Sequence, residues 1–241
     1  MLLGMSEHVS GNIIAQRQID AKSNEIPALR ALIAGMDLTG CLFTADAAHC
    51  QKATATAVVA ADGDYLLTLK ANQASLLRAV IPLLSGTDEQ WANRCHTSTD
   101  RGHGRTEQRT VRVTAAAGII DFPHAAQVFR TVRYTGGLDG QRTRKQVVYG
   151  LTSLTPDLAG PAEIAAAQRG HWGIENRSHH VRDTTFDEDR SQVRTRHAPR
   201  NMAALRNLAT DACRANEHVN IAHARRHYTH SYQRLLDLYQ L

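Results

Sequence analysis

The sequence predicts an α/β fold: a parallel pair of strands joined by a helix, then a block of antiparallel strands, then helices. Two short apolar runs, at 41–47 and 65–70, have the length and composition of buried strands. An Ala-rich segment at 52–61 lies between them and is expected to be helical. A strand, a helix and a second strand in this order favour parallel pairing.

The segments on either side of this unit carry their own signals. Residues 12–19 alternate between apolar and polar and follow a Ser-Gly-Asn turn, so two strands joined by a tight turn are expected at the start of the chain. A helix should end at Gly35, with Pro27 in its first turn. Asn72 is expected to cap a further helix that reaches about Leu84.

The second half of the sequence changes from strand-like to helical patterns. Strand-like runs between Gly-rich turns indicate an antiparallel insertion, and they lie at 109–113, 127–134 and 144–154. Helical patterns return after Gly160 and Pro161 and predict helices over 161–182, 198–216 and 219–229. We therefore expect three parts: a first part of the core at 1–85, a β-rich insertion at 86–158, and a helical C-terminal segment at 159–241.

Composition excludes several classes of protein. The 241 residues are 42% hydrophobic and 21% charged, which supports a packed core and argues against a disordered chain. The apolar runs are too short for a membrane span, and no basic region precedes an apolar one near residue 1. The 4 cysteines form no CxxC pair. We expect a reduced, cytoplasmic protein without a membrane partner.

Charge is distributed unevenly along the chain. The net charge is +5, but residues 1–100 are acidic overall, whereas 101–241 are basic and Arg-rich, with Lys145 as their single lysine. Guanidinium groups match phosphate oxygens in two-point contacts, so this half could bind an anionic polymer. A solvated basic surface is the alternative.

Asp46 and Glu175 are the main candidates for chemistry. Asp46 ends a predicted buried strand, where α/β sheets place ligands and metals, although it could simply cap the next helix. Glu175 shares one face of the helix predicted over 161–182 with His171 and His179, and Arg182 joins that face. This set could hold a divalent cation or form ordinary i, i+4 pairs. We expect Trp172 and Ile174 to be buried and to hold Glu175 against the sheet.

Two further segments could contact phosphates. In residues 100–105, two glycines expose backbone N–H groups among cationic side chains, although the segment could be only a tight turn before a strand. Acidic residues at 183–189 precede a series of arginines, which could form a phosphate-binding stripe with Arg206 or a self-paired loop. The expected DNA contacts from these segments are Arg101, His103, Arg105, Arg182, Arg190, Arg194 and Arg196.

Together, these segments resemble DDE-type transposases of bacterial insertion sequences, in the group that includes the H-repeat-associated proteins. The resemblance covers about residues 1–230 and rests on these segments: FTADAAHCQ (43–51), GDYLLTLKANQ (63–73), DRGHGRTEQR (100–109), RGHWGIENRSHHVRDTTFDEDRS (169–191) and NMAALRNLA (201–209). It implies a ribonuclease-H-like core with a β-rich insertion. Asp46 matches the second catalytic Asp of the family and Glu175 its Glu.

The resemblance also implies cofactors and partners. Carboxylates of such a site hold two Mg²⁺ or Mn²⁺ ions, which promote in-line displacement at phosphorus. The implied partner is DNA, both as transposon ends and as target. The resemblance leaves open whether the chain forms a homo-oligomer.

One departure from the family pattern concerns the first catalytic Asp, which members carry in a DGK-type segment. No DGK occurs in this sequence, and Asp20 falls in a segment that matches a non-catalytic one. The implied function is that of a DDE transposase, which cleaves and transfers DNA strands with divalent metal ions. We nevertheless expect this chain to be N-terminally truncated, to lack the first core strand and not to cleave DNA alone. One alternative is an inactive remnant that binds only DNA or a full-length partner. Another is a nuclease that uses His171, Glu175 and His179.

Overall fold

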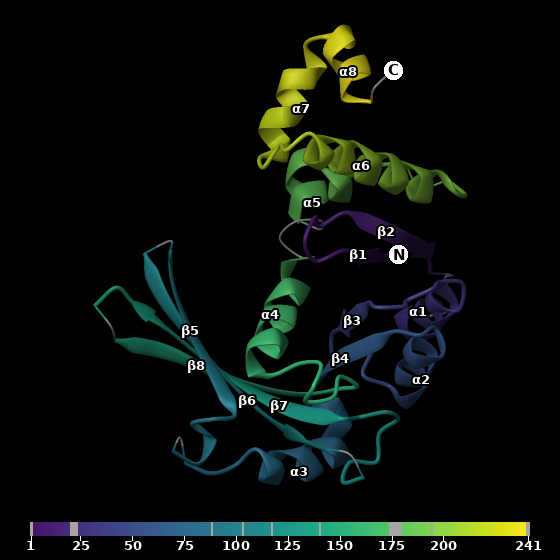
Figure 1. Ribbon diagram of the computed structural model, residues 1–241. Helices are drawn as coiled ribbons and strands as arrows, with labels where there is room; N and C mark the ends of the chain where they lie inside the picture. The colour runs from purple at the N-terminus through teal and green to yellow at the C-terminus, as the bar shows by residue number, and fades with distance from the viewer. Residues whose placement is uncertain are drawn as a thin grey trace. The chain divides into compact units, whose positions relative to one another are not determined.

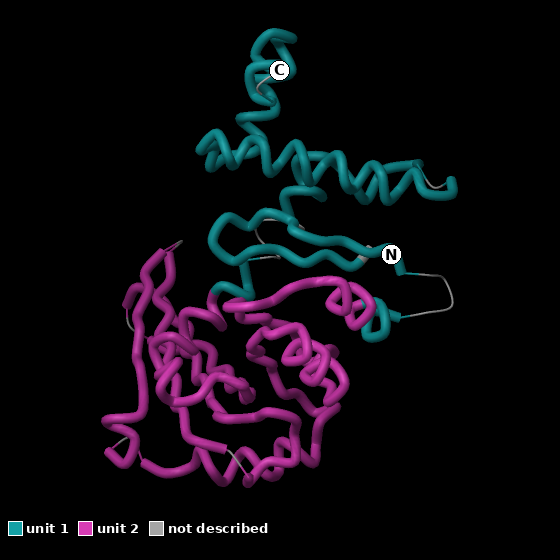
Figure 2. Tube along the Cα trace, turned by 45° about the vertical axis from the view of Figure 1, so that its right-hand side comes forward, with its two compact units in different colours: residues 1–28, 170–241 teal, residues 29–169 magenta. Residues whose placement is uncertain are grey.

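The computed structural model describes residues 2–19, 24–87, 89–102, 104–116, 118–139, 141–173, 180–193 and 195–239. The chain divides into two compact units (Figure 2). Unit 1 contains residues 1–28 and 170–241, and unit 2 contains residues 29–169.

Unit 2 is built on a six-stranded sheet with the strand order β3-β4-β8-β7-β6-β5 (Figure 1). The strands are β3 (Leu42–Ala45), β4 (Asp64–Leu69), β5 (Cys95–Gly102), β6 (Arg105–Ala115), β7 (Gln127–Gly137) and β8 (Arg142–Thr152). β3 and β4 are parallel and the other neighbours are antiparallel, which confirms a mixed α/β fold and the predicted parallel pair. The predicted antiparallel strands join this same sheet, because β8 pairs with β4.

The helices of unit 2 lie where the sequence patterns predict them, although α4 is shorter than predicted. They are α1 (Glu25–Ile33, shared with unit 1), α2 (Lys52–Ala60), η1 (Ala71–Gln73), α3 (Ala74–Leu83), η2 (Glu89–Trp91) and α4 (Pro161–His171, whose last two residues belong to unit 1). In Figure 1, α4 lies on one face of the sheet and α3 on the other. α2 turns Ala55 and Val58 inward, and both are fully buried.

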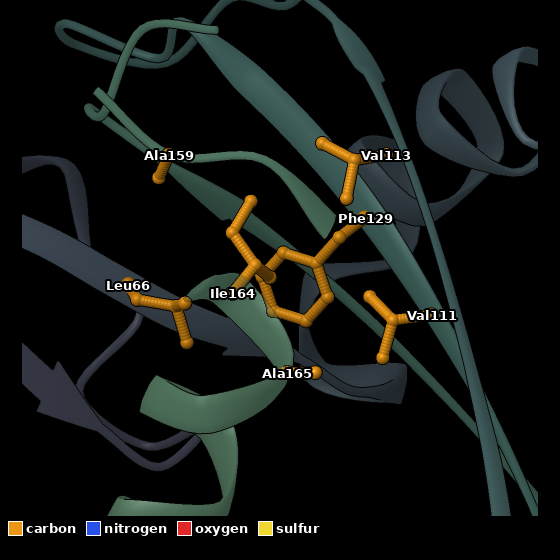
Figure 3. Packing of buried hydrophobic residues seen from close by; sticks show 7 residues of the cluster. All are labelled: Leu66, Val111, Val113, Phe129, Ala159, Ile164 and Ala165. Atoms are coloured by element: carbon orange, nitrogen blue, oxygen red, sulfur yellow. The ribbon is translucent and has the colours of Figure 1, made fainter. Parts of the chain in front are cut away.

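The core of unit 2 forms where α4 meets the sheet (Figure 3). Phe129 on β7 and Ile164 on α4 are fully buried at its centre. Leu66, Val111, Val113, Ala159 and Ala165 surround them. Gly150 on β8 leaves room for the Phe129 ring, because a Cβ there would overlap the ring. The side chain of Gln127 donates to the carbonyl oxygens of Leu154 and Ala159, at 2.8 and 3.0 Å, and so fixes the entry into α4.

Strands β6, β7 and β8 are each 11 residues long, which is longer than predicted for β6 and β7. We call the halves next to the core, 111–115, 127–131 and 148–152, together with β3 and β4, the proximal part of the sheet. The distal part contains residues 97–102, 105–110, 132–137 and 142–147. Its sequence is polar, and β5 in particular lacks the apolar alternation that identifies strands.

Unit 1 contains a hairpin and a group of helices. The hairpin strands are β1 (Leu2–Ser6) and β2 (Ile13–Gln18), as predicted, and the helical elements are α5 (His180–Phe186), η4 (Glu188–Arg190), α6 (Ala198–Ala215), α7 (Ile221–Thr229) and α8 (Tyr232–Leu238). Hydrogen bonds tie the hairpin to α6, among them those from Asn207 Nδ2 to Gln16 Oε1 at 3.1 Å and from Arg214 to the Gly11 carbonyl oxygen at 2.6 Å. Cys213, Ile221, Ala224 and Leu238 form a second small core.

Candidate active site

Asp46 follows the last residue of β3, where Ala45 pairs with Leu67 of the parallel strand β4. Its carboxylate is exposed, and Oδ1 accepts a hydrogen bond from the N–H of Ala48 at 3.0 Å. The N-cap residue of α2 is Gln51. The alternative that Asp46 caps the next helix is therefore wrong. Asp46 instead stabilises a turn at the carboxyl end of a parallel strand, which is where α/β sheets bind ligands.

Two side chains that follow β4 hold the loop after β3 in place. Asn72 Nδ2 donates to the carbonyl oxygen of Ala47 at 3.1 Å, and Gln73 Nε2 donates to that of Cys50 at 2.6 Å. The prediction that Asn72 caps α3 is wrong, because α3 begins at Ala74 and Asn72 lies in η1. A short amide after a strand suits either role, and only the tertiary structure distinguishes them.

The donor chemistry of this loop favours a hard cation at Asp46. Burial raises the pKa of the Cys50 thiol to about 12, so Cys50 is a neutral thiol at pH 7 and a poor ligand or nucleophile. The Asp46 carboxylate supplies the oxygen atoms that Mg²⁺ and Mn²⁺ prefer. Within the described ranges, no three His, Cys, Asp or Glu side chains form a group that could hold a metal ion. A complete site would therefore need further ligands.

The segment expected to supply the second carboxylate begins at the end of α4. This helix ends at His171, and Trp172 lies in a turn, so the single helix predicted over 161–182 is interrupted between two weak helix formers, Gly170 and Gly173. Trp172 is 48% exposed, so its predicted place in the core is wrong. Residues 174–179, which include Glu175, Ile174 and His179, lie outside the described residues. The joint site of Asp46 and Glu175 therefore stays a prediction.

Gly170 has a packing role that the motif alone did not explain. In unit 1 it lies against the imidazole of His8, and a Cβ at this position would overlap Nδ1 of that ring. Glycine is therefore required for this close approach. Burial lowers the pKa of His8, so the imidazole is neutral at pH 7. The start of this segment thus packs against the β1–β2 turn of its own unit.

Comparison with known proteins decides the family. The description "Transposase DDE domain" applies to the family whose sequence model matches residues 5–211. The chain belongs to this family. This confirms the resemblance that the sequence motifs indicated.

Individual relatives agree with this membership. The "H repeat-associated putative transposase YhhI" of Escherichia coli is 28% identical over 205 residues, which are 82% of this chain and 53% of that protein. An uncharacterised protein from the dhlA 3′ region of Xanthobacter autotrophicus is 37% identical over 101 residues, 42% of this chain and 34% of that protein. The chain spans about half the length of YhhI.

Of the arginines expected to contact DNA, some are exposed and others are paired with carboxylates. Arg101 and Arg105 are exposed and flank the turn of the β5–β6 hairpin, in which Gly102 pairs with Arg105 and Gly104 has a φ of +74°. The tight turn predicted here is therefore confirmed, and its phosphate contacts stay a prediction. His103 lies outside the described residues. Arg190 and Arg196 are exposed as well.

The acidic and basic residues after α5 are partly paired with each other. Arg182 Nε lies 3.0 Å from Glu188 Oε2, and Arg206 lies 3.8 Å from the same oxygen. All three side chains are at most 20% exposed. Arg182 is therefore paired with a carboxylate, as the alternative of a self-paired loop predicts. Arg190, by contrast, is 82% exposed, and its contact with Asp187 is long, at 3.7 Å. Arg194 lies outside the described residues.

In the described part of the chain, no helix is both long enough and apolar enough to cross a membrane.

Proposed function

We propose that this chain is part of a DDE transposase that cleaves DNA strands and transfers them with the help of divalent metal ions. The proposal rests mainly on one observation: in a chain of the transposase DDE domain family, an exposed carboxylate, Asp46, stands at the carboxyl end of a parallel strand. The relative YhhI, whose name describes it as an H repeat-associated putative transposase, supports it.

In the proposed arrangement, residues 1–85, with the parallel strands β3 and β4, form the first part of a ribonuclease-H-like core. Residues 86–158 are its β-rich insertion, and 159–241 carry the second carboxylate and the C-terminal helices. Asp46 and Glu175 would hold two Mg²⁺ or Mn²⁺ ions together with a further acidic ligand. When bound, such ions activate the attacking oxygen and stabilise the leaving oxygen of a phosphoryl transfer.

The protein's own groups would position the DNA for this chemistry. The loop that carries Asp46 is held by Asn72 and Gln73, which limits movement of the carboxylate. Transposon-end and target DNA would contact the exposed arginines Arg101, Arg105, Arg190 and Arg196, together with His103, Arg182 and Arg194. These contacts place phosphates without reading base sequence.

A metal-directed cleavage experiment tests the site separately from DNA cleavage. Fe²⁺ replaces Mg²⁺, and ascorbate with hydrogen peroxide then generates hydroxyl radicals at the bound ion, which cut the nearby backbone. We expect two cuts, near residues 46 and 175, and suppression of both by excess Mg²⁺ or Mn²⁺. Asp46→Asn and Glu175→Gln should each abolish both cuts, because Mg²⁺-type sites depend on each carboxylate oxygen.

The matched control is Asp121→Asn. This exposed carboxylate pairs with Lys52 at 2.7 Å and has no proposed role in metal binding. It should leave both cuts unchanged. A cut near only one of the two residues would contradict a shared site.

A further inference from the structure

One face of the distal part of the sheet carries cations without carboxylates. The distal strands contain seven basic residues and only two acidic ones, Asp100 and Glu107. Strand alternation places both acids on the face that α4 covers, where Asp100 pairs with Arg109 at 2.9 Å and with Arg169 at 3.1 Å, and Glu107 also pairs with Arg109. The opposite face therefore has cations and no strand carboxylate to neutralise them.

That opposite face, which we call the Tyr134 face, is defined by the ladder Thr99–Gln108–Tyr134–Lys145 and its neighbours. Its other members on the distal strands are Thr97, Arg101, Thr106, Thr110, Val132, Gly136, Arg142 and Val147. On β5 and β8, the outer strands of the distal part, the residues of the Tyr134 face are exposed. On the other face of these strands, Ser98, Asp100 and Gln146 are half-buried. The face is thus accessible along β5 and β8.

The cations on β8 are held in position rather than extended at random. Arg142 donates to Gln108 Oε1 at 2.7 Å, and its guanidinium carbon lies 4.2 Å from the centre of the Tyr134 ring. Lys145 Nζ lies 5.6 Å from the same ring. A guanidinium has five N–H donors, so the bond to Gln108 leaves others for a phosphate oxygen. Preorientation by the ring reduces the entropy lost on binding.

The spacing of the cations suits double-stranded DNA. Arg101 lies on β5 and the other two cations on β8, three strand spacings away, which is about 14 Å at ~4.8 Å per strand. The major groove of B-DNA is about 12 Å wide. Cations on β5 and β8, the outer strands of the distal part, can therefore reach phosphates on both sides of one groove. The neutral Thr and Gln side chains between them can donate further hydrogen bonds.

We propose that the Tyr134 face binds the phosphate backbone of duplex DNA through Arg101, Arg142 and Lys145. The inference rests on the proposed function for its choice of polyanion. It extends the contact predicted at Arg101 to Arg142 and Lys145 on the same face, which neither the sequence motifs nor Asp46 indicated. Tyr134 acts as a positioning residue for Arg142 and Lys145. No metal ion is required for this binding.

The test measures binding of the full chain to a fluorescent duplex of arbitrary sequence, in EDTA, over a series of salt concentrations. Arg142→Gln and Lys145→Gln should each weaken binding about fivefold to tenfold at 0.1 M salt and lower the slope of log K against log salt by about 1. The double variant should lower the slope by about 2. Arg144→Gln is the matched control, since Arg144 is exposed and adjacent to Lys145 but lies on the opposite face.

The outcomes separate this surface from the proposed function. An equal loss in Arg144→Gln would overturn the face assignment and attribute binding to the general charge of the hairpins. Unchanged binding in Arg142→Gln and Lys145→Gln would also overturn the assignment of the Tyr134 face, but it would leave the proposed DNA binding by the chain intact. If the wild-type chain binds no duplex at low salt, both the surface and the DNA-binding part of the proposed function fail. Unaltered circular dichroism of each variant verifies folding.

Discussion

The proximal and distal parts of the six-stranded sheet are built largely from the same strands, yet they differ in almost every physical respect. In β7, Val128 and Phe129 are fully buried, with Phe129 packed against α4, whereas Tyr134 a few residues further on is half-buried among cations. Backbone pairing continues through both parts. The hydrogen-bonded ladder therefore extends the sheet beyond its apolar core.

The largest expected contrast is in thiol reactivity next to the candidate site. Cys50 is completely buried in the loop after Asp46, and its pKa is raised to about 12, whereas Cys41 is exposed. At pH 8 the thiolate fraction of Cys50 should be roughly a thousandfold lower than that of an ordinary cysteine. Iodoacetamide labelling followed by peptide mass spectrometry should modify Cys41 readily and Cys50 only after unfolding. Rapid labelling of native Cys50 would show that this loop opens.

Replacement of one aromatic residue in each part of β7 should lower the free energy of unfolding by different amounts. Phe129→Ala removes a ring from the centre of the core and should lower the free energy of unfolding by about 3–5 kcal/mol. Tyr134→Ala, on the same strand, should cost about 1 kcal/mol or less, since its ring is only half-buried. Urea unfolding can be followed by the fluorescence of the buried Trp91 in a Trp172→Phe background. Equal losses would contradict the division into two parts.

Glycine substitutions sharpen the same contrast through steric overlap. The added Cβ of Gly150→Ala would meet the Phe129 ring and the Leu67 carbonyl, and should destabilise unit 2 by about 1–3 kcal/mol. At Gly102, in the distal part, a Cβ meets nothing within 4 Å. Gly102→Ala should therefore be neutral or slightly stabilising in the same urea experiment.

The smallest expected effects on stability belong to the distal cations. Arg142→Gln, Lys145→Gln and Arg144→Gln should each change the free energy of unfolding by about 0.5 kcal/mol or less, because exposed charges contribute little. The urea midpoints should therefore coincide with that of the wild type. A loss above about 2 kcal/mol would show that these side chains support the fold, and their binding data would then need reinterpretation.

Much of the candidate site was predictable as single residues but not as an arrangement. Asp46 could be located because the apolar run before it is a local signal for a buried strand. The support from Asn72 and Gln73 was not predictable, since their partners lie more than 20 residues earlier in the chain. The exposure of Trp172 was also missed, because an aromatic residue beside a helical pattern carries no information on whether the helix ends there.

By itself, the sequence determined the elements whose signals are local. The length of an apolar run, the Ala content and a Pro at a helix start were enough to predict β3, β4, α2 and α6. The helix α6 begins and ends within one residue of its predicted bounds. The family motifs identified the DDE transposase domain.

Only the tertiary structure decided the strand order, the existence of β5 and the two faces of the distal sheet. These depend on backbone ladders and on partners distant in sequence: β8 pairs with β4 across about 80 residues, and Arg142 reaches Gln108 across β7. A polar strand such as β5 has no apolar periodicity of its own, so its pairing with β6 makes it a strand.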